Sequence, residues 1–246
     1  MVLTGFGALG DRLKWAQRIT VLTGAGISAE SGIPTFRGPG GIWRTYKAED
    51  LATPEAFARD PKTVWEWYDW RRGLISRARP NAGHLALAEL ERRVGGGGGE
   101  RNFTLVTQNV DGLHDRAGSR NIVKLHGDIW EMRCLDCGAA ARNEQVPLEP
   151  LPPRCNCGGL LRPGVIWFGE PLPEAAWERA YRGSGRAQVF LVIGTSATVY
   201  PAAGLAQVAR EGGAKLAIFN PEPTPLEGLA DWVLRQPSGE ILPRLL

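Results

Sequence analysis

The sequence lacks the features that mark membrane proteins, secreted proteins and nucleic-acid binders. It has no apolar run close to the roughly 20 residues that a membrane helix needs. Asp11, Arg12 and Lys14 interrupt the N-terminal stretch, which therefore does not resemble a signal peptide. The formal net charge is only +3, and no stripe of Arg and Lys with interleaved aromatic residues is present, so direct binding to nucleic acid is not expected. These absences favour a cytoplasmic protein with no membrane partner.

Cysteine is scarce and confined to one short segment, at Cys134, Cys137, Cys155 and Cys157. In a reducing cytosol this clustering favours a metal over disulfides. Two residues separate the first pair, 17 residues separate the pairs and one residue separates the second pair. This spacing is close to that of a tetrahedral zinc ribbon, although the second pair is one residue tighter than usual. Four thiolates close the coordination shell, so we predict one structural zinc ion, with disulfides or unliganded thiols as the alternative.

Histidine is scarcer still, with three residues in the chain. His84 lies on a predicted helix and His114 follows a predicted turn, whereas His126 stands at the end of a short predicted strand. A histidine with a pKa near neutrality can accept a proton from a hydroxyl group. His126 is therefore the candidate general base, and a histidine that only caps its strand is the alternative.

The stretch from Thr20 to Gly38 carries the strongest positive signal. An apolar run ends in Gly24-Ala25-Gly26, which predicts a buried strand that feeds a tight turn. Glycines let the backbone approach a ligand closely, and a helix that begins after them favours a phosphate at its N-terminus. Ala29 stands where the usual dinucleotide fingerprint has its third glycine, so the pattern by itself is weak. The polar residues that crowd the rest of the loop strengthen it: Ser28, Glu30, Ser31, Thr35 and Arg37.

Short apolar strands alternate with helices along the chain, which predicts an α/β fold with a Rossmann-like, doubly wound parallel sheet. Polar clusters follow several of the predicted strands. In such sheets, ligands bind outside the carboxyl ends of the strands, so we expect the clusters to share one site. These clusters are Gly24–Ser28, Gln108–Asp111, His126, Gly194–Ser196 and Asn220–Glu222.

The chain is expected to form two domains with the active cleft between them. We assign residues 1–36, 84–129 and 163–246 to the Rossmann-like domain. The smaller domain combines a helical part, residues 37–83, with a zinc-ribbon part, residues 130–162. Within the larger domain, the consecutive glycines from Gly95 to Gly99 predict a flexible surface loop.

The run from Gly24 to Arg37, Gly-Ala-Gly-Ile-Ser-Ala-Glu-Ser-Gly-Ile-Pro-Thr-Phe-Arg, closely resembles the NAD-binding signature of the sirtuins, the NAD-consuming protein-lysine deacylases. Further motifs in the same order extend the resemblance from about Leu13 to Leu242. It implies an enzyme with NAD as co-substrate and supports the structural zinc ion. It also implies that the NAD contacts come from Gly24, Ala25, Gly26, Ser28, Glu30, Thr35, Phe36, Arg37, Trp43, Gln108, Asn109, Val110, Asp111, Gly194, Thr195, Ser196, Asn220, Pro221, Glu222 and Ser238.

The resemblance also assigns catalytic roles. The segment Lys124-Leu125-His126-Gly127 is similar to the sirtuin catalytic segment, which makes His126 the catalytic base. The segment Gln108-Asn109-Val110-Asp111 matches the part that holds the nicotinamide end, with Val110 at a variable position and Asn109 as a second catalytic residue. Turn formation alone also explains Asn109 and Asp111.

Other residues acquire supporting roles from the same resemblance. Glu222 is expected to bind the adenosine ribose, with Pro221 in place of the more common apolar residue before it, and a solvated turn is the alternative. Phe36 is expected to shield the reactive ribose from water. Arg37 is expected to order the loop.

Two further segments resemble substrate-binding parts of sirtuins. The stretch from Gly164 to Gly169 is similar to the segment that pairs with a peptide beside the modified lysine. A core strand would show the same pattern. The residues that we assign to the peptide site are Val165, Trp167, Phe168 and Gly169.

Tyr68 and Arg71 stand three residues apart on a predicted helix and so share a face. A phenol and a guanidinium together suit a carboxylate at the end of an acyl chain, whereas a core tyrosine beside a solvated arginine is the alternative. The pair matches the motif of the sirtuins that remove succinyl and malonyl groups, and Ala48 matches their small residue that widens the pocket. The expected partners are acyl-lysine proteins or peptides, bound by a monomeric enzyme.

The reaction that the resemblance implies starts when the acyl-lysine carbonyl oxygen attacks the ribose C1′ and nicotinamide leaves. His126 then deprotonates a ribose hydroxyl, which attacks the acyl carbon, and water completes the transfer to give free lysine, nicotinamide and O-acyl-ADP-ribose. The rivals are a hydride-transferring dehydrogenase, a zinc-ribbon nucleic-acid binder and an ADP-ribosyl transferase. Free nicotinamide in a reaction mixture would separate the enzyme from the first rival. The near-neutral charge argues against the second, and a labelled protein product would mark the third.

Overall fold

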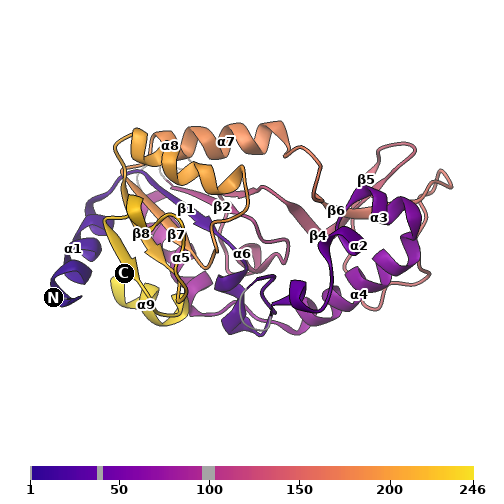
Figure 1. Cartoon of the computed structure of the whole chain (residues 1–246), viewed down its shortest axis with the longest axis horizontal. Coiled ribbons are helices and arrows are strands. Elements are labelled where there is room, and N and C mark those ends of the chain that lie inside the picture. The colour runs from indigo at the N-terminus through magenta and orange to yellow at the C-terminus, as the bar shows by residue number, and fades with distance from the viewer. Residues whose placement is uncertain (1, 38–40, 96–102) are drawn as a thin grey trace.

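The structure, a computed structural model, describes residues 2–37, 41–95 and 103–246, apart from the side chains of residues 2–5 and 43. The chain forms two lobes that lie side by side (Figure 1). The larger lobe contains a six-stranded sheet between helices, and the smaller lobe contains a three-stranded sheet and a group of helices. Apart from Gly95, the predicted glycine loop falls outside the described residues.

The large sheet is parallel throughout, which confirms the predicted doubly wound α/β fold. Its strand order is β3-β2-β1-β7-β8-β9, so the direction of winding reverses between β1 and β7. Ligands bind at such reversal points in open α/β sheets. The strands are β1 (Ile19–Thr23), β2 (Phe103–Thr107), β3 (Ile122–Lys124), β7 (Val189–Ile193), β8 (Lys215–Phe219) and β9 (Trp232–Leu234).

Helices cover both faces of this sheet, which is why its central strands are apolar along their whole length. Val21 belongs to one hydrophobic cluster and Leu22 to another, because successive side chains point to opposite faces. Phe6, near the N-terminus, also packs against the first cluster. One face is covered by α1 (Val2–Trp15), α5 (Ala82–Gly95) and α9 (Ser238–Leu245), the other by α7 (Glu174–Gly185) and α8 (Leu205–Glu211) (Figure 1).

The smaller lobe begins with helices α2 (Ala48–Leu51), α3 (Pro54–Arg59) and α4 (Pro61–Arg77). The Thr53 side chain accepts a hydrogen bond from the Ala56 N–H at 3.1 Å, and the Asp60 side chain accepts one from the Thr63 N–H at 3.1 Å. Each of these caps precedes a proline at the first helical position, where the missing N–H is not needed. Local sequence therefore determines where α3 and α4 start.

The small sheet is antiparallel, with the order β5-β4-β6 for β4 (Gly127–Cys134), β5 (Ala140–Arg142) and β6 (Leu161–Val165). Its residues share one hydrophobic core with α4, in which Trp65 and Ile75 are fully buried. The helical part and the cysteine-rich part thus pack as one lobe. The same core includes Leu113 and Ile129, which the predicted boundaries place in the larger domain. The residue boundaries of the two domains therefore stay predictions.

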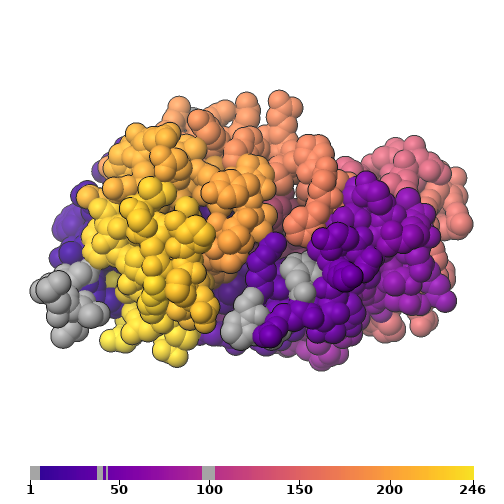
Figure 2. Space-filling view, in the orientation of Figure 1, coloured from indigo at the N-terminus to yellow at the C-terminus, as the bar shows by residue number. Residues whose placement is uncertain are grey.

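The remaining elements are short. They are α6 (Leu113–Arg116) and the 3-10 helices η1 (Ala25–Ser31), η2 (Ile42–Arg44), η3 (Ala202–Gly204) and η4 (Glu227–Leu229). The segment 164–169, expected to be extended, leaves β6 after Val165 and turns. Across the described ranges, no helix combines the length and the apolar character needed to cross a bilayer. The space-filling view shows the small lobe in purple and rose beside the yellow and orange C-terminal segments of the large lobe (Figure 2).

Candidate active site

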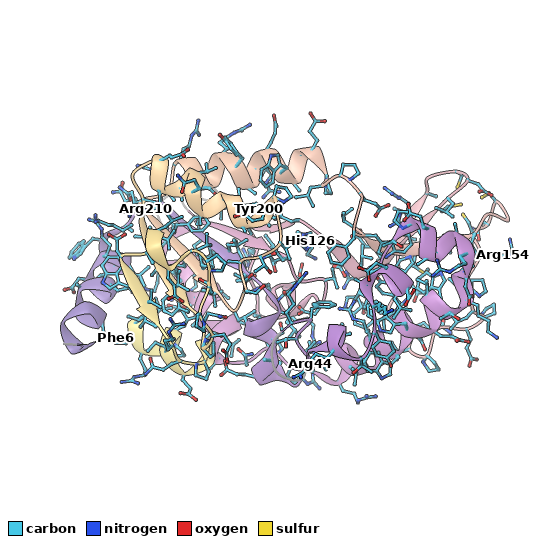
Figure 3. All side chains as sticks on the ribbon, in the orientation of Figure 1. Phe6, Arg44, His126, Arg154, Tyr200 and Arg210 are labelled. Carbon is cyan, nitrogen blue, oxygen red and sulfur yellow. The ribbon has the colours of Figure 1, made fainter. Side chains whose placement is uncertain are left out.

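A cavity of about 910 Å³ is lined by residues of both lobes. Its volume lies within the range of about 300–1,000 Å³ that is usual for small-molecule and cofactor sites. His126, which lines it, lies in the middle of the molecule, close to Tyr200 in this view (Figure 3). The predicted site residues that line the cavity are Gly24, Ala25, Gly26, Thr35, Phe36, Arg37, Tyr68, Arg71, Gln108, Asn109, Val110, His126, Val165, Trp167, Phe168, Gly169, Gly194, Thr195, Ser196, Asn220, Pro221 and Glu222.

Two glycine turns cross at the wall of the cavity. The Gly26 N–H donates to the Gly194 carbonyl oxygen at 2.7 Å, and a Cβ atom on Gly26 would lie 2.7 Å from that oxygen. Gly194 has a φ of +59°, and its own Cβ atom would lie 2.2 Å from the Ile27 nitrogen. Neither position tolerates a side chain. The turns after β1 and β7 therefore require these glycines, and they bring bare backbone to the strand ends where a ligand would bind.

His126 reaches the cavity from the turn between β3 and β4. Its Nδ1 lies 3.0 Å from the Gln108 carbonyl oxygen. Because a carbonyl oxygen only accepts hydrogen bonds, Nδ1 must carry the proton, and Nε2 keeps a free lone pair. Burial lowers the pKa of His126 below its ordinary value of 6.5, and the contact with Gln108 opposes this shift only in part. The imidazole is therefore neutral at pH 7 and can accept a proton at Nε2.

This geometry predicts how a reaction that uses His126 as its base depends on pH. Neutral imidazole is the active form and its pKa is lowered, so kcat/KM should be constant above pH 6.5 and decline only below it. The measurement is kcat/KM from mildly acidic to mildly alkaline pH. Circular dichroism at each pH is the control, because the folded protein also loses stability in acid. Burial lowers the pKa of His84 to about 4, so the stability that the neutral form of His84 contributes is lost as the pH falls from 6.5 toward 4. A rate that rises toward acid would contradict the assignment.

Behind the cavity wall, a buried network joins three of the predicted NAD contacts. Ser28 Oγ donates to Asp111 Oδ2 at 2.8 Å. The Asn109 Nδ2 donates to Ser28 Oγ at 3.3 Å and to the Gly24 carbonyl oxygen at 3.1 Å. Burial raises the pKa of Asp111. Of the three, only Asn109 lines the cavity, so Ser28 and Asp111 hold the side chain of Asn109 from behind.

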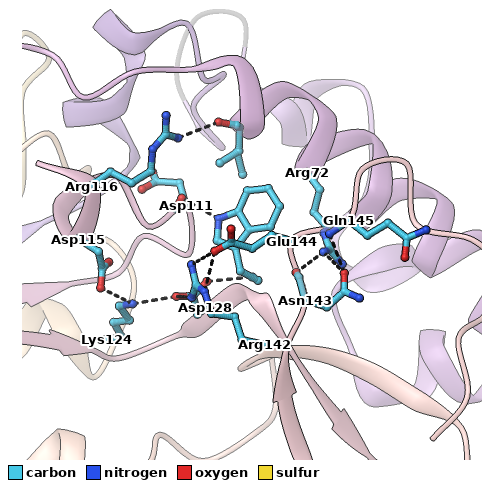
Figure 4. A network of polar contacts seen from close by, with 12 residues as sticks. Arg72, Asp111, Asp115, Arg116, Lys124, Asp128, Arg142, Asn143, Glu144 and Gln145 are labelled. Carbon is cyan, nitrogen blue, oxygen red and sulfur yellow. Dashed lines mark hydrogen bonds and ion pairs between the residues drawn. The ribbon is translucent and has the colours of Figure 1, made fainter.

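A second network fixes the turn that carries His126 (Figure 4). Asp128 on β4 accepts hydrogen bonds from Lys124 at 2.8 Å and from Arg142 at 3.4 Å. Lys124 also pairs with Asp115 at 2.8 Å. The side chain of Asp128 is only 2% exposed, and a charge-assisted hydrogen bond is stronger where water is excluded. His126 lies between Lys124 and Asp128 in sequence, so the network holds the base from both sides.

Tyr68 and Arg71 line another part of the cavity, from one face of α4, as the helical spacing predicts. They are 2% and 7% exposed. The Arg71 Cζ lies 4.8 Å from the Phe36 ring centre and 4.9 Å from the Trp67 ring centre. No carboxylate in the described part of the chain forms a hydrogen bond or an ion pair with Arg71. Burial lowers the pKa of Arg71, and the electrostatic interactions with Tyr68 and Asp111 oppose this shift only in part. The Tyr68 hydroxyl accepts a hydrogen bond from the Trp167 indole N–H at 2.9 Å, and burial raises the pKa of Tyr68, which keeps it protonated.

Some predicted contacts lie away from the cavity. Ala48 does not line it, whereas Ala52, one helical turn later, does. Glu30 and Ser238 contact each other instead, with Ser238 Oγ 3.4 Å from Glu30 Oε1. The side chain of Trp43 is outside the described residues. The roles of these residues stay predictions.

Sequence reasoning also missed residues that line the cavity, among them Trp67, Trp177 and Tyr200. Trp67 precedes Arg71 by one helical turn and so shares its face, which is a signal that the sequence did contain. Trp177 on α7 and Tyr200 after β7 carry no local signal, because only the packing of α7 and α8 brings their segments to the cavity.

The four cysteines gather in the small lobe, with all their sulfur atoms within 4.8 Å of one another. Cys134 Sγ lies 3.5 Å from Cys157 Sγ, and Cys137 Sγ lies 3.8 Å from Cys155 Sγ. Zn–S bonds of about 2.3 Å in a tetrahedron place sulfur atoms about 3.8 Å apart, so the donor set fits zinc. The predicted four-thiolate site for a structural zinc ion is confirmed despite the short second pair.

Removal of zinc is expected to destabilise the protein. The metal would hold β4 to the loop before β6, and a structural site of this kind contributes several kcal/mol to folding. Treatment with a strong chelator should release about one zinc ion per chain and lower the melting temperature by roughly 10 °C. The measurements are metal analysis and thermal unfolding, with Cys137→Ser as a variant that should reproduce the loss. A metal-free protein with unchanged stability would refute this prediction.

The reversal of the parallel sheet, the crossed glycine turns and the cavity that reaches a neutral histidine define a dinucleotide-binding α/β protein. The chain belongs to the Sir2 family, whose sequence profile matches residues 24–201. This confirms the resemblance to sirtuins that the motifs indicate.

Individual relatives agree over nearly the whole chain. The NAD-dependent protein deacylase of Aquifex aeolicus (strain VF5) is 55% identical over 90% of either chain. The NAD-dependent protein deacylase 2 of Pyrobaculum aerophilum is 53% identical over 97% of this chain and 93% of its own. Among solved structures, a Sir2 homologue–NAD complex is 47% identical, with a TM-score of 0.88 over 97% of this chain and 91% of its own. A Sir2–p53 peptide–NAD+ complex is 34% identical, with a TM-score of 0.85 over 96% and 94%.

Proposed function

We propose that this chain, an NAD-dependent protein deacylase, removes succinyl and malonyl groups from lysine side chains as well as acetyl groups. The observation that carries the acidic-acyl part is the buried guanidinium of Arg71, which lines the cavity and forms no hydrogen bond or ion pair with a carboxylate among the described residues. A buried cation without a partner is costly, and a bound carboxylate offsets that cost. Tyr68 supplies a second donor in the same part of the cavity. A succinyl or malonyl carboxylate is the partner that this pair suits.

The NAD end of the cavity is assigned from the strand ends. We place the diphosphate on the turn from Gly24 to Ser28, the adenosine ribose at Asn220 and Glu222, and the nicotinamide end at Asn109. The support is that these segments meet at one cavity, apart from Ser28, which holds Asn109 from behind. When bound, NAD supplies the ADP-ribose to which the acyl group is transferred.

His126 acts as the general base in this proposal. Its Nε2 accepts a proton from a ribose hydroxyl after the acyl oxygen has attacked the ribose C1′, while the Gln108 carbonyl keeps Nδ1 protonated. The resulting imidazolium is stabilised by the same hydrogen bond. Phe36 lines the cavity next to Arg71 and would exclude water from the reacting sugar.

The acylated peptide is proposed to bind along the segment from Val165 to Gly169. This segment follows β6 and lines the cavity, and Phe168 is 42% exposed there. An extended peptide that ran beside this segment would present its modified lysine to the cavity. We further propose that the enzyme acts as a monomer in the cytoplasm, where its thiolates would stay reduced.

Mass spectrometry of NAD incubated with acetylated and with succinylated peptides tests this function. We expect nicotinamide, free lysine and the matching O-acyl-ADP-ribose from both peptides. Product from the acetylated peptide alone would remove the acidic-acyl part and leave the deacylase. A reduced cofactor would indicate a dehydrogenase, and a peptide that carries ADP-ribose would indicate a transferase.

A further inference from the structure

A buried ion pair holds the loop that follows β6. Arg162 is 5% exposed and donates to both carboxylate oxygens of Glu170, at 2.5 and 2.8 Å. Glu170 Oε2 also accepts the backbone N–H of Trp167 at 2.7 Å, and Arg162 Nη2 donates to the Val165 carbonyl oxygen at 2.9 Å. Bidentate pairs of this kind are strong and geometrically specific. The Arg162–Glu170 pair, here termed the clasp, therefore fixes the backbone from Val165 to Glu170.

The clasp also fixes the indole ring of Trp167. The Arg162 Cζ lies 3.6 Å from the ring centre, in a cation–π contact. The Phe57 ring packs against the same indole, with ring centres 5.2 Å apart. Trp167 is 4% exposed. Glu170 holds the backbone N–H of Trp167, and Arg162 and Phe57 hold its ring. The indole therefore has one orientation, in which the indole N–H points to the Tyr68 hydroxyl.

The hydrogen bond from Trp167 determines what the Tyr68 hydroxyl can do. A phenol oxygen carries one hydrogen, which prefers the ring plane on either side of the C–O bond, and it can also accept hydrogen bonds. The indole N–H reaches this oxygen at 2.9 Å as a donor, so the phenol hydrogen must point to the other side. Within the described residues, that hydrogen has no acceptor, and Tyr68 lines the cavity with Arg71. The hydroxyl is thus held as a donor toward a group in the cavity.

We propose that Trp167 is a positioning residue for acidic-acyl selectivity, because its N–H commits the Tyr68 hydroxyl to donate to the acyl carboxylate and the clasp keeps it in that position. The inference rests on the proposed function and goes beyond the pairing of Tyr68 with Arg71. An acetyl group has no carboxylate, so it cannot use this donor. Trp167 and Tyr68 are 99 residues apart in sequence, and their relation is visible only in the folded chain.

A double-mutant cycle tests the inference. Trp167→Phe keeps an aromatic ring but removes the N–H, and Tyr68→Phe removes the hydroxyl. The measured quantity is the ratio of kcat/KM for a succinylated peptide to kcat/KM for the acetylated form of the same peptide. Trp167→Phe should lower this ratio by about tenfold, through KM for the succinylated peptide, as expected for one charge-assisted hydrogen bond. In the Tyr68→Phe background, the same change should leave the ratio unaltered.

Trp65→Phe is the matched control. Trp65 lies on the same helix as Tyr68, is fully buried and donates its indole N–H to the Leu161 carbonyl oxygen at 2.8 Å, but it does not line the cavity. It should lower stability without changing the ratio. Glu170→Gln loosens the clasp and keeps the indole, so it provides a second variant if Trp167→Phe fails to fold. Glu170→Gln should lower the ratio when Tyr68 is present and should leave it unchanged in the Tyr68→Phe background.

Three results would overturn the inference. The first is an equal loss of both activities in Trp167→Phe, and the second is a fall in the ratio that persists in the Tyr68→Phe background. In both cases Tyr68→Phe alone would still lower the ratio, so the proposed acidic-acyl function would stand. The third is a wild-type ratio that Tyr68→Phe leaves unchanged, which would refute the acidic-acyl function and the role of Trp167 together.

Discussion

Replacement of His126 by alanine is expected to lower kcat/KM for deacylation by about 10³-fold, within the range that a positioned general base contributes. The reason is geometric: the Gln108 carbonyl fixes the proton on Nδ1 and leaves Nε2 as a basic atom at the cavity. Alanine removes this atom and leaves the surrounding network around Asp128 intact. The measurement is O-acyl-ADP-ribose formed per unit time at saturating NAD.

The control for His126→Ala is the step that precedes proton transfer. In the proposed mechanism, nicotinamide leaves before His126 acts, so exchange of labelled nicotinamide into NAD should continue in the variant. Thermal unfolding should also be close to that of the wild type. If exchange and deacylation were lost together while the fold was intact, His126 would act in NAD binding instead of proton transfer. Full deacylation by the variant would remove it from the mechanism.

The double variant Tyr68→Phe, Arg71→Met should lower kcat/KM for desuccinylation by about 10²-fold more than that for deacetylation. The guanidinium of Arg71 is buried against Phe36 and Trp67 and forms no hydrogen bond or ion pair with a carboxylate among the described residues. Loss of one partner from a buried charge pair costs about 3–5 kcal/mol. Because each 1.4 kcal/mol is about a tenfold change in affinity, an effect of about 10²-fold is the lower end of the expected range. Steady-state kinetics on matched peptides gives the ratio.

Arg77→Met is the matched control for this double variant. Arg77 lies near the end of the same helix, is exposed and does not line the cavity. Its replacement removes the same charge from the protein but should leave both activities unchanged. The contrary result is an equal loss of desuccinylation and deacetylation in the double variant while Arg77→Met stays normal. That result would mean that Tyr68 and Arg71 support the fold of α4 and do not recognise the acyl carboxylate.

Much of the fold could be predicted from short patterns. The strands β7 and β8 are apolar runs that end at polar residues, and the helix starts at Pro54 and Pro61 follow from their caps. Such signals are local, because a capped helix start or an apolar run uses neighbours within a few residues. The segment after β6 was predicted less well. Its turn after Val165 depends on the side-chain pair of Arg162 and Glu170, which no helix or strand period reports.

In the candidate site, too, some residues could be assigned from local patterns and others only from the folded structure. The glycine turn, Gln108 to Asp111 and His126 could be assigned because each follows a strand in a parallel sheet, and strand ends meet at one edge. Ala48 was expected at the acyl pocket, but Ala52 lines the cavity. The choice between them depends on how α2 packs against α4, and no spacing along the sequence reports it.

The sequence by itself determined the family, the four thiolates and which residue types carry the chemistry, because these depend on residue identity and on distances of a few positions along the chain. The tertiary structure alone decided the tautomer of His126, the burial of Arg71 against aromatic rings and the link from Trp167 to Tyr68. Each of these depends on burial and on hydrogen bonds between segments far apart in sequence. Such contacts exist only when the chain is folded, since it is folding that excludes water and fixes the orientation of each donor.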